Sequence, residues 1–223
     1  YADYTGIMSV GWNADKYGDI SSLDDLLDPK FAGTVALNGK PAEAGAAFNG
    51  YLMANQLAGG DINNLQPGLD YFKKLKEAGN LTTVDVTNGT IDSGQTGVVF
   101  DWTYNQASYK KELKDKGVNW KYKTFPKAQV VSYYNQAINK DAPHPAAARL
   151  WEEYLYTADA QNLWFKGGAN PVLLDSMKED GTVDQATLKD AITIEGEPVS
   201  YTNDDSTRIT EWLQNNWDKT IGN

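Results

Sequence analysis

The residues of this chain best suited to bind a small molecule are aromatic and polar side chains that follow short apolar runs. The clearest case is Asp101-Trp102, with Tyr104 two residues further on, directly after the run at residues 97–100. A run of Val and Phe bounded by Gly is typical of a strand covered on both faces, and ligands of α/β sheets bind just beyond the carboxyl ends of such strands. We therefore expect Asp101, Trp102 and Tyr104 at the mouth of a binding site.

Three further expected strand ends carry residues of the same kinds. Aromatic faces attract cations and stack on planar groups, and a buried carboxylate needs a partner that offsets its desolvation. The alternative for each aromatic residue alone is ordinary packing in the core or at its rim. Because the residues coincide with strand ends, we expect them to converge on one cleft, and the predicted ligand-binding residues are Trp12, Asn13, Lys40, Asp101, Trp102, Tyr104, Tyr133, Tyr134 and Asn135.

Several kinds of chemistry have no support in the sequence. His144 is the one histidine and lies between two prolines, and the chain has no cysteine, so a histidine-based triad or metal site would depend on His144 alone. No phosphate-binding or dinucleotide-binding glycine fingerprint occurs. Adjacent acids such as Asp24-Asp25, Glu152-Glu153 and Asp204-Asp205 fall on expected helices or loops and are interpreted as solvated surface. We expect no catalytic residue, no resident metal and no cofactor.

Composition narrows the range of partners. The 223 residues are 41% hydrophobic, enough to bury a sizeable core in one large domain or two modest lobes. The formal net charge of −10 argues against a nucleic-acid partner and would steer a cation favourably, although an acidic surface also serves solubility. No run of about 18 apolar residues occurs, and residues 1–4 lack the features of a signal peptide, so any export signal is expected outside this sequence.

Strands and helices are expected to alternate along the chain, which predicts an α/β fold. The expected strands lie at residues 5–13, 34–37, 83–86, 97–100, 119–124 and 130–138. Capping residues, prolines and apolar stripes predict helices that begin at Ser21 or Ser22 and at Ala42, and further helices at 66–78, 104–116, 145–155 and 184–191. A second short helix is expected through residues 161–165, and a last one begins at Ser206.

Four segments carry a family resemblance. They are residues 31–37 (FAGTVAL), 93–102 (SGQTGVVFDW), 137–148 (AINKDAPHPAAA) and 154–161 (YLYTADAQ). In their order and spacing they resemble extracellular solute-binding proteins of bacterial ABC importers, in the branch that serves polyamines, ferric iron, thiamine and phosphonates. The resemblance implies a type II periplasmic-binding-protein-like fold of two α/β lobes, a ligand in the cleft between them, and delivery to a membrane permease. It implies a location outside the cytoplasm, in a periplasm or as a lipoprotein on a Gram-positive cell surface, and no enzymatic activity.

The resemblance also implies a division of the chain. Residues 1–13 would be the first segment that crosses between lobes, residues 14–128 the second lobe, and residues 129–223 the returning hinge strand with the C-terminal part of the first lobe. The family's first lobe begins with strands and helices ahead of the first crossing. The first lobe is therefore expected to be incomplete here, and a preceding segment or a second chain would complete it.

The resemblance leaves the ligand open between several candidates. Ferric-binding members carry adjacent tyrosines where Asp101-Trp102 stands here, which disfavours iron, and the neighbouring side chains of Tyr133 and Tyr134 should point to opposite faces of a strand. Polyamine-binding members use carboxylates and aromatic walls, which Asp101, Trp102 and Trp12 would supply.

Other ligands and other classes of function stay open. Lys40 precedes the helix expected at Ala42, and a helix N-terminus suits a phosphate or a phosphonate. A thiamine-like ligand is a further alternative within the family. We rank a polyamine-like cation above these. The competing classes are a hydrolase with two carboxyl groups about 5 to 10 Å apart across its cleft and a structural module with a closed core.

Overall fold

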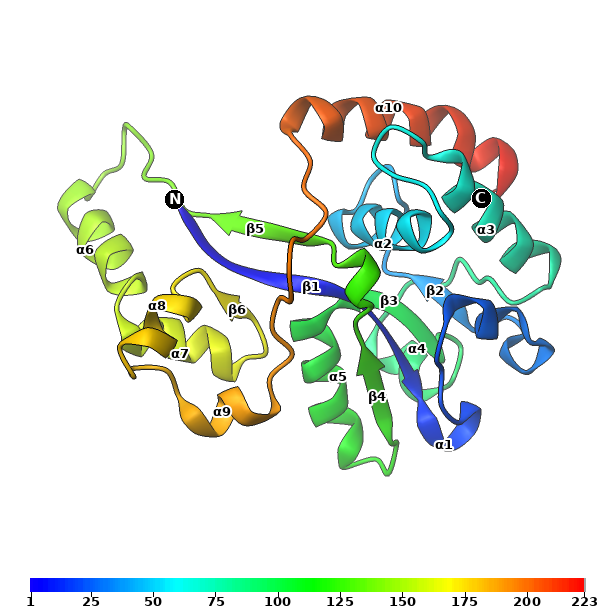
Figure 1. Ribbon diagram of the computed structural model, residues 1–223, viewed down its shortest axis with the longest axis horizontal. Helices are drawn as coiled ribbons and strands as arrows, with labels where there is room; N and C mark the ends of the chain where they lie inside the picture. Colours follow the sequence, from blue (N-terminus) through cyan, green and yellow to red (C-terminus); the bar gives the residue numbers. More distant parts are fainter. Residues whose placement is uncertain (223) are drawn as a thin grey trace.

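The chain is organised around one long strand, β1 (Ala2–Asn13), in a computed structural model that describes residues 1–222. The C-terminal half of β1 pairs with β3 (Val98–Trp102) and β4 (Trp120–Lys123), and its N-terminal half pairs with β5 (Val131–Asn135) and β6 (Asn170–Pro171). All four pairings are antiparallel, whereas β2 (Val35–Leu37) joins β3 in parallel. β1 therefore extends from a larger part of the molecule into a smaller part, with β5 beside it (Figure 1).

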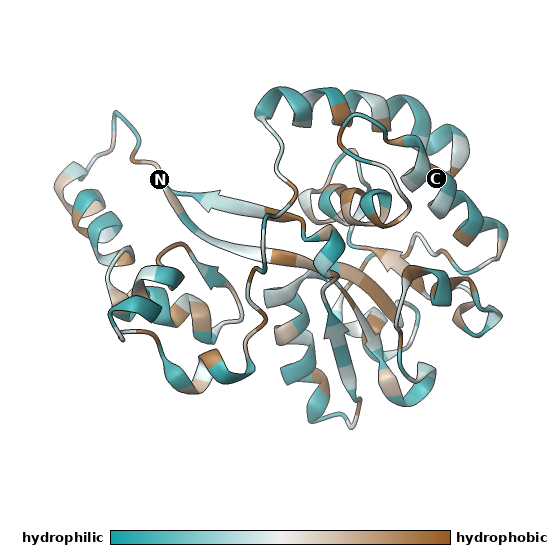
Figure 2. Cartoon of the chain, viewed as in Figure 1, coloured by the Kyte–Doolittle hydropathy of each residue, from teal (hydrophilic) through white to brown (hydrophobic). Residues whose placement is uncertain are grey.

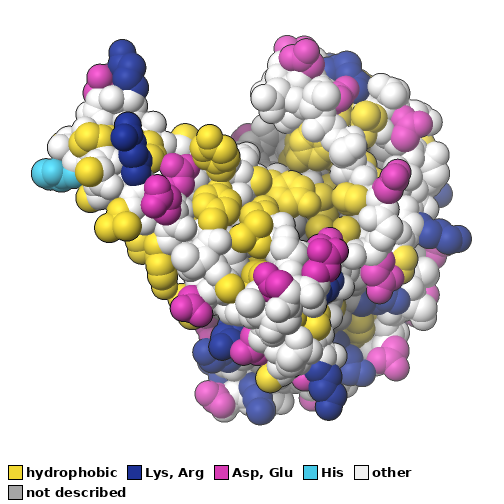
Figure 3. Space-filling view, turned by 60° about the vertical axis from the view of Figure 1, so that its left-hand side comes forward, with side chains coloured by type: hydrophobic (Ala, Val, Ile, Leu, Met, Phe, Trp, Pro, Cys, Tyr) yellow, Lys and Arg dark blue, Asp and Glu magenta, His cyan; other side chains and the backbone are white. Residues whose placement is uncertain are grey.

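The smaller part consists of short helices around the N-terminal half of β1. These are α6 (Pro145–Leu155), α7 (Ala158–Lys166), α8 (Leu174–Glu179) and α9 (Gln185–Asp190), of which the sequence analysis missed α8. Hydrophilic residues are frequent along these helices (Figure 2), but Leu150 and Trp151 of α6 are large apolar side chains that lie exposed. A hollow separates this part from the larger one, and hydrophobic side chains line its floor (Figure 3).

The larger part is built on the sheet order β2-β3-β1-β4. Helix α2 (Gly45–Leu57), with α3 (Gln66–Glu77) and α10 (Asn203–Thr220) outside it, covers one face, and α5 (Thr103–Lys114) covers the other (Figure 1). Shorter elements complete the part: α1 (Ala14–Tyr17), η1 (Leu23–Leu27), η2 (Pro29–Phe31), α4 (Asn88–Asp92) and η3 (Pro126–Ala128).

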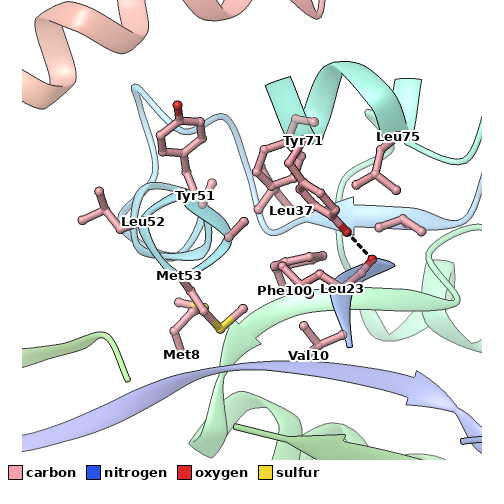
Figure 4. Close-up of a cluster of buried hydrophobic side chains, with 14 of the residues drawn as sticks. Met8, Val10, Leu23, Leu37, Tyr51, Leu52, Met53, Tyr71, Leu75 and Phe100 are labelled. Carbon is pink, nitrogen blue, oxygen red and sulfur yellow. Dashed lines mark hydrogen bonds between the residues drawn. The ribbon is translucent and has the colours of Figure 1, made fainter. Parts of the chain in front are cut away.

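The main hydrophobic core lies between this sheet and its helices. Met8 and Phe100 of the strands lie on the side of α2 that carries Met53, Tyr51 points from α2 away from the sheet, and Leu75 of α3 packs from outside (Figure 4). All five side chains are fully buried. Burying such a side chain stabilises the fold by about 1.5–3 kcal/mol, which makes this core the principal source of stability for the larger part.

Several element predictions were wrong in type or extent. Residues 83–86 form no strand, because only Leu81 bridges to Val35 and the exposed Val84 has no partner strand. The helix expected from Ser21 or Ser22 is the 3₁₀ helix η1, with Ser22 as its N-cap.

Other elements differ at their ends. Helix α2 begins at Gly45 rather than Ala42, because Lys40 first accepts the hydrogen bonds of a turn from the backbone of Glu43 and Ala44. Strand β5 ends at Asn135 rather than residue 138, where its pairing with β1 ends. Helix α10 begins at Asn203 rather than Ser206, because Thr202 is its N-cap.

Helix α10 belongs to the larger part. Its Ile209, Leu213 and Trp217 lie in the same core as Tyr51 and Phe72, with the Trp217 and Phe72 rings 5.3 Å apart. The expected assignment of all residues 129–223 to the first lobe therefore does not describe this helix, while the other domain boundaries stay a prediction. Within residues 1–222, no helix combines the length and apolar character needed to cross a membrane.

A capping box fixes the start of α10 and links it to the rest of the larger part. The Asp205 carboxylate accepts hydrogen bonds from the backbone N–H and hydroxyl of Thr202 and pairs with Arg208, which also donates to the carbonyl of Ile62. The backbone hydrogen bond from Thr202 contributes most to lowering the pKa of Asp205 to about 2. An ionised Asp205 therefore stabilises the helix start.

This arrangement predicts an acid-sensitive stability. Because the folded-state pKa of Asp205 lies below its ordinary value of 3.8, its contribution is present above about pH 5 and is lost as the pH falls toward about 2. We expect Asp205→Asn to lower the urea midpoint of unfolding at neutral pH and to flatten its decline in acid. The neighbouring exposed Asp204→Asn is the control, and equal urea midpoints for the two variants at neutral pH would contradict this role of Asp205.

Candidate functional site

Five aromatic side chains meet where the larger and smaller parts join, and we call them the junction cluster: Tyr4, Trp102, Tyr104, Tyr134 and Trp164. Tyr4 stacks between two rings, with its centroid 4.9 Å from Tyr134 and 4.4 Å from Trp164. Tyr104 stacks on Trp102 at 6.3 Å and meets Tyr4 edge to face at 6.1 Å. The cluster thus joins β3 and α5 of the larger part, the paired strands β1 and β5, and α7 of the smaller part.

Two glycines make room for Tyr104. A Cβ on Gly6 of β1 would lie 2.6 Å from Cε1 of Tyr104, and a Cβ on Gly168 would lie 3.3 Å from its Cα. Gly168 also has a φ of +87°, which L side chains rarely adopt. Tyr104 therefore depends on glycines from both strand β1 and the segment after α7.

Two tyrosine hydroxyls of the cluster, those of Tyr104 and Tyr4, have surroundings that favour the protonated form. The hydroxyl oxygens of Tyr104 and Tyr134 lie 2.9 Å apart and share a hydrogen bond. Burial raises the pKa of Tyr104, and the hydrogen bond with Tyr134 raises it further. Burial also raises the pKa of Tyr4. The cluster reaches the surface at Tyr134, which is 46% exposed.

Asp101, the expected counter-charge for a cation, is buried and fully hydrogen-bonded. Its Oδ1 accepts from the backbone N–H of Trp102 at 2.7 Å and from Asn105 at 2.9 Å, and its Oδ2 accepts from Asn38 at 2.8 Å and Tyr109 at 2.9 Å. Burial raises the pKa of the carboxyl, and these hydrogen bonds oppose that shift. The side chain is 0% exposed, so Asp101 makes no contact with solvent at the groove.

Trp12 and Asn13 lie far from Asp101, and their predicted place in one cleft with it was wrong. β1 is antiparallel to β3, so Trp12 pairs with Val98 at the start of β3 and not with its end. The Trp12 indole is buried and donates to the carbonyl of Gly18, and Asn13 caps α1 through its side chain.

The returning strand does reach the junction. Tyr134 pairs with Tyr4 and enters the cluster, whereas its neighbour Tyr133 pairs with Thr5, which agrees with the expected opposite orientation of adjacent side chains. Asn135, at the end of β5, is exposed and donates weakly to the carbonyl of Tyr133 at 3.4 Å. The ligand-binding role of these three residues stays a prediction.

A cavity of about 240 Å³ lies at the first turn of α2, beside β5. Ser132 of β5, Tyr201, and Ser206 and Thr210 of α10 share its lining with residues 41–45. Lys40 does not line this cavity and instead borders grooves beside Trp217 and Asp218 of α10. The segment after Lys40 therefore lies beside β5, whereas Lys40 itself lies beside α10.

Three residues that matter here were missed from the sequence: Tyr4, Trp164 and Asn38. Tyr4 precedes the expected strand start at residue 5, Trp164 was interpreted as an apolar helix residue, and Asn38 as a turn residue. Only the tertiary pairing of β1 with β5 and β6 brings Tyr4 beside Trp164. A small signal exists, because Tyr4 and Gly6 alternate with Thr5 as residues of one strand face should.

Two α/β parts joined by strands that run from one to the other, with an aromatic wall at the junction, define the class of two-lobe binding proteins. The profile described as "Bacterial extracellular solute-binding protein" matches residues 1–191. The chain therefore belongs to this family, whose members are extracytoplasmic solute-binding proteins. A search of curated proteins gave no significant match.

Solved structures agree with the class. A periplasmic thiamin binding protein superposes with a TM-score of 0.70 at 14% identity, over 100% of this chain and 67% of its own. The spermidine/putrescine-binding protein PotD from Streptococcus pneumoniae gives 0.68 at 14% identity, over 99% and 69%. AfuA from Actinobacillus pleuropneumoniae, with fructose-6-phosphate bound, gives 0.65 at 19% identity, over 99% and 67%.

These similarities establish the fold as that of type II periplasmic binding proteins. The chain spans about two-thirds of the length of each of these three structures, and 61% of the sulfate-binding protein SubI from Mycobacterium tuberculosis. The type II periplasmic-binding-protein-like α/β fold expected from the sequence is confirmed.

The tight packing around Gly6 gives a test of the junction cluster. We expect Gly6→Ala to displace the Tyr104 ring, because the new Cβ would lie 2.6 Å from Cε1, and thus to break the hydrogen bond with Tyr134. The measurements are the near-ultraviolet circular dichroism of the aromatic rings and the thermal midpoint, both of which should fall. Gly89→Ala, whose Cβ would meet its nearest neighbour at an ordinary 3.7 Å, is the control, and an unchanged spectrum in Gly6→Ala would refute the packing described.

Proposed function

We propose that this protein is the substrate-binding component of an ABC importer, which captures a small polar or charged solute at the junction of its two parts and delivers it to a membrane permease. The observation that carries the proposal is the junction cluster, where Tyr104 and Tyr134 present aromatic faces between the larger part and the hinge. Membership of the solute-binding family supports the transport role. We place the protein in a periplasm or, as a lipoprotein, on a Gram-positive cell surface.

A polyamine-like cation is the solute we favour. Its support is the aromatic wall together with the net charge of −10, which attracts cations from solution. Asp101 does not contact the cation directly in this proposal, because donors from the protein itself occupy both oxygens of its carboxylate. The cation would therefore be held by aromatic faces, each worth about 0.5–2 kcal/mol, and by groups on the other side of the hollow between the two parts (Figure 3).

A phosphate-bearing or thiamine-like solute is the second candidate. The first turn of α2 has Ala44 at its N-cap with no side-chain cap, and Ala44 and Gly45 line the cavity that Ser132 also lines. Uncapped N–H groups suit an anion. Ferric iron ranks lower, because Tyr133 and Tyr134 diverge, and within residues 1–222 no group of three His, Asp or Glu side chains is placed to hold a metal ion.

The carboxylate hydrolase is disfavoured by the surroundings of Asp101. The groups that contact its oxygens are two amides, one phenol and one backbone N–H, and no solvent reaches the carboxylate. A general acid or base must come within hydrogen-bond reach of its substrate. We therefore propose a binding role without catalysis.

We also propose that a further polypeptide segment, from the same chain or another, covers α6 and α7. Leu150 and Trp151 on α6 are 69% and 59% exposed, and Leu163 on α7 is 62% exposed. The outer edge of β5 carries no strand among residues 131–135 of the described chain, so it too can accept a partner. This segment would complete the smaller part as a lobe.

Isothermal titration calorimetry with spermidine, putrescine, thiamine, inorganic phosphate and ferric citrate tests the solute proposal. We expect spermidine or putrescine to bind, and Tyr104→Ala and Tyr134→Ala each to weaken that binding by about tenfold, since each removes a ring worth roughly 1–2 kcal/mol. Trp151→Ala on α6, also a loss of an exposed ring, is the matched control that should bind as the wild type does.

Each result has a distinct meaning. Binding of phosphate or thiamine in place of a polyamine would replace the first candidate with the second. Binding that survives both tyrosine substitutions would remove the junction cluster from the site. The absence of heat with every solute would overturn the binding role for this chain.

A further inference from the structure

Asp101 raises a question that the solute proposal leaves unanswered. A carboxylate in a buried position is costly unless its charge is offset, yet none of the ion pairs in the described residues involves it. Its four hydrogen bonds use the four acceptor positions that a carboxylate offers. No position is left for a solute, so the reason for this buried charge lies in what the four donors hold.

The side-chain donors come from two segments of the larger part, the loop after β2 and helix α5. Asn38 stands directly after β2, at the start of the loop that leads through Lys40 to the first turn of α2. Asn105 and Tyr109 lie four residues apart on α5, so their side chains share one face of that helix, and both donate to Asp101. One carboxylate thus joins the end of β2 to the first two turns of α5.

The segments that Asp101 joins are the two walls offered to a solute by the larger part. Residues 41–45 line the cavity beside Ser132. Tyr104, between Asp101 and Asn105 in sequence, carries the junction cluster. The carbonyl of Asp101 also accepts from the Ser9 hydroxyl at 2.6 Å, which fixes the same point to β1.

Resting on the proposed solute-binding function, we propose that Asp101 is a positioning residue, which sets the separation between the loop after β2 and the start of α5 without touching the solute. Charge-assisted hydrogen bonds are shorter and stronger than neutral ones. A single ionised group can therefore hold three flexible side chains and one backbone N–H in a fixed geometry. The identity of the solute does not enter, so the role should be the same for a cation and an anion.

This role differs in its consequences from direct contact. A direct counter-charge would matter for a cation alone, and Asn38 could be removed without loss. A positioning residue predicts that Asp101→Asn and Asn38→Ala act alike, because both break the same link, and that they weaken binding of any solute held between the two walls.

The chain contains no cysteine, so a pair of spin labels can report the separation directly. Labels at Lys40→Cys and Lys110→Cys, both exposed positions, flank the link on the loop and on α5. We expect a narrow distance distribution by double electron–electron resonance in the parent and a broadened or shifted one after Asp101→Asn or Asn38→Ala. This readout needs no solute.

Asp184→Asn is the matched control. Asp184 caps α9 on the smaller part by accepting from the backbone N–H of Thr187 at 2.9 Å, so its replacement perturbs a helix start but not the link. Thermal unfolding of Asp184→Asn should change while the label distance stays that of the parent. Tyr109→Phe, which removes one donor and keeps the ring, replaces Asp101→Asn if the latter does not fold.

Calorimetry on the unlabelled variants completes the test, with spermidine and inorganic phosphate as probes. We expect Asp101→Asn and Asn38→Ala each to weaken binding of whichever probe binds the wild type by about tenfold, as for loss of a hydrogen bond to a charged group. An unchanged label distance in folded Asp101→Asn overturns the proposal. Loss of spermidine binding in Asp101→Asn alone, with Asn38→Ala intact, also overturns it, because that result marks a direct contact.

If neither spermidine nor inorganic phosphate binds the wild type, the proposed binding of these solutes is contradicted. The label distances still decide whether Asp101 sets the separation of the two walls. The two proposals therefore fail separately.

Discussion

The continuous hydrogen bonding of β1 is the constraint on which the rest of the structure depends. Residues 2–7 pair with β5 and β6, and residues 8–13 pair with β3 and β4, so one strand belongs to both parts. Its register sets where the parts stand relative to one another. It also sets the junction cluster, because Tyr4 and Gly6 on one strand provide both a ring for Trp164 and the space for Tyr104.

Burial and hydrogen bonding, more than charge pairing, stabilise this arrangement. The ion pairs of the described residues lie at the surface, with side chains such as those of Lys73 and Glu77 more than half exposed. Such pairs contribute about 0–1 kcal/mol each. Buried hydrogen bonds contribute more, as in the link between Gln106, the carbonyl of Val99 and the indole of Trp120 under Gly11. Small residues in β1 are therefore structural requirements and not gaps in the pattern.

The sequence predicted the parts of the fold that depend on local pattern. The apolar run that ends at Phe100, the amphipathic helix α3 and the returning strand near Tyr134 all stand where periodicity placed them. What pattern cannot give is the direction in which two strands pair. The sequence predicted a strand that ends in Trp12-Asn13. Because β1 pairs with β3 in the antiparallel direction, these residues lie at the opposite end of β3 from Asp101.

The same limit applies to burial. Asp101 follows a buried strand and looks like a residue at an open mouth, and its environment depends on Asn38, which is 63 residues away in sequence. Tyr4 and Trp164 are 160 residues apart and meet only because β6 pairs with β1. Residue type indicated binding chemistry at this end of the sheet, while the division between groups that contact a solute and groups that hold the site required the tertiary structure.

The composition of the junction cluster limits what it can contribute to affinity. Its aromatic rings carry no full charge, and the carboxylate of Asp101 is shielded by its own donors. Two cation–π contacts supply about 1–4 kcal/mol, which corresponds to millimolar affinity or weaker. The net charge of −10 raises the local cation concentration, but its field is screened beyond about 8 Å at physiological ionic strength. Tight binding of a cation at the junction cluster therefore requires a carboxylate that faces Tyr104 and Tyr134 from the other side of the hollow.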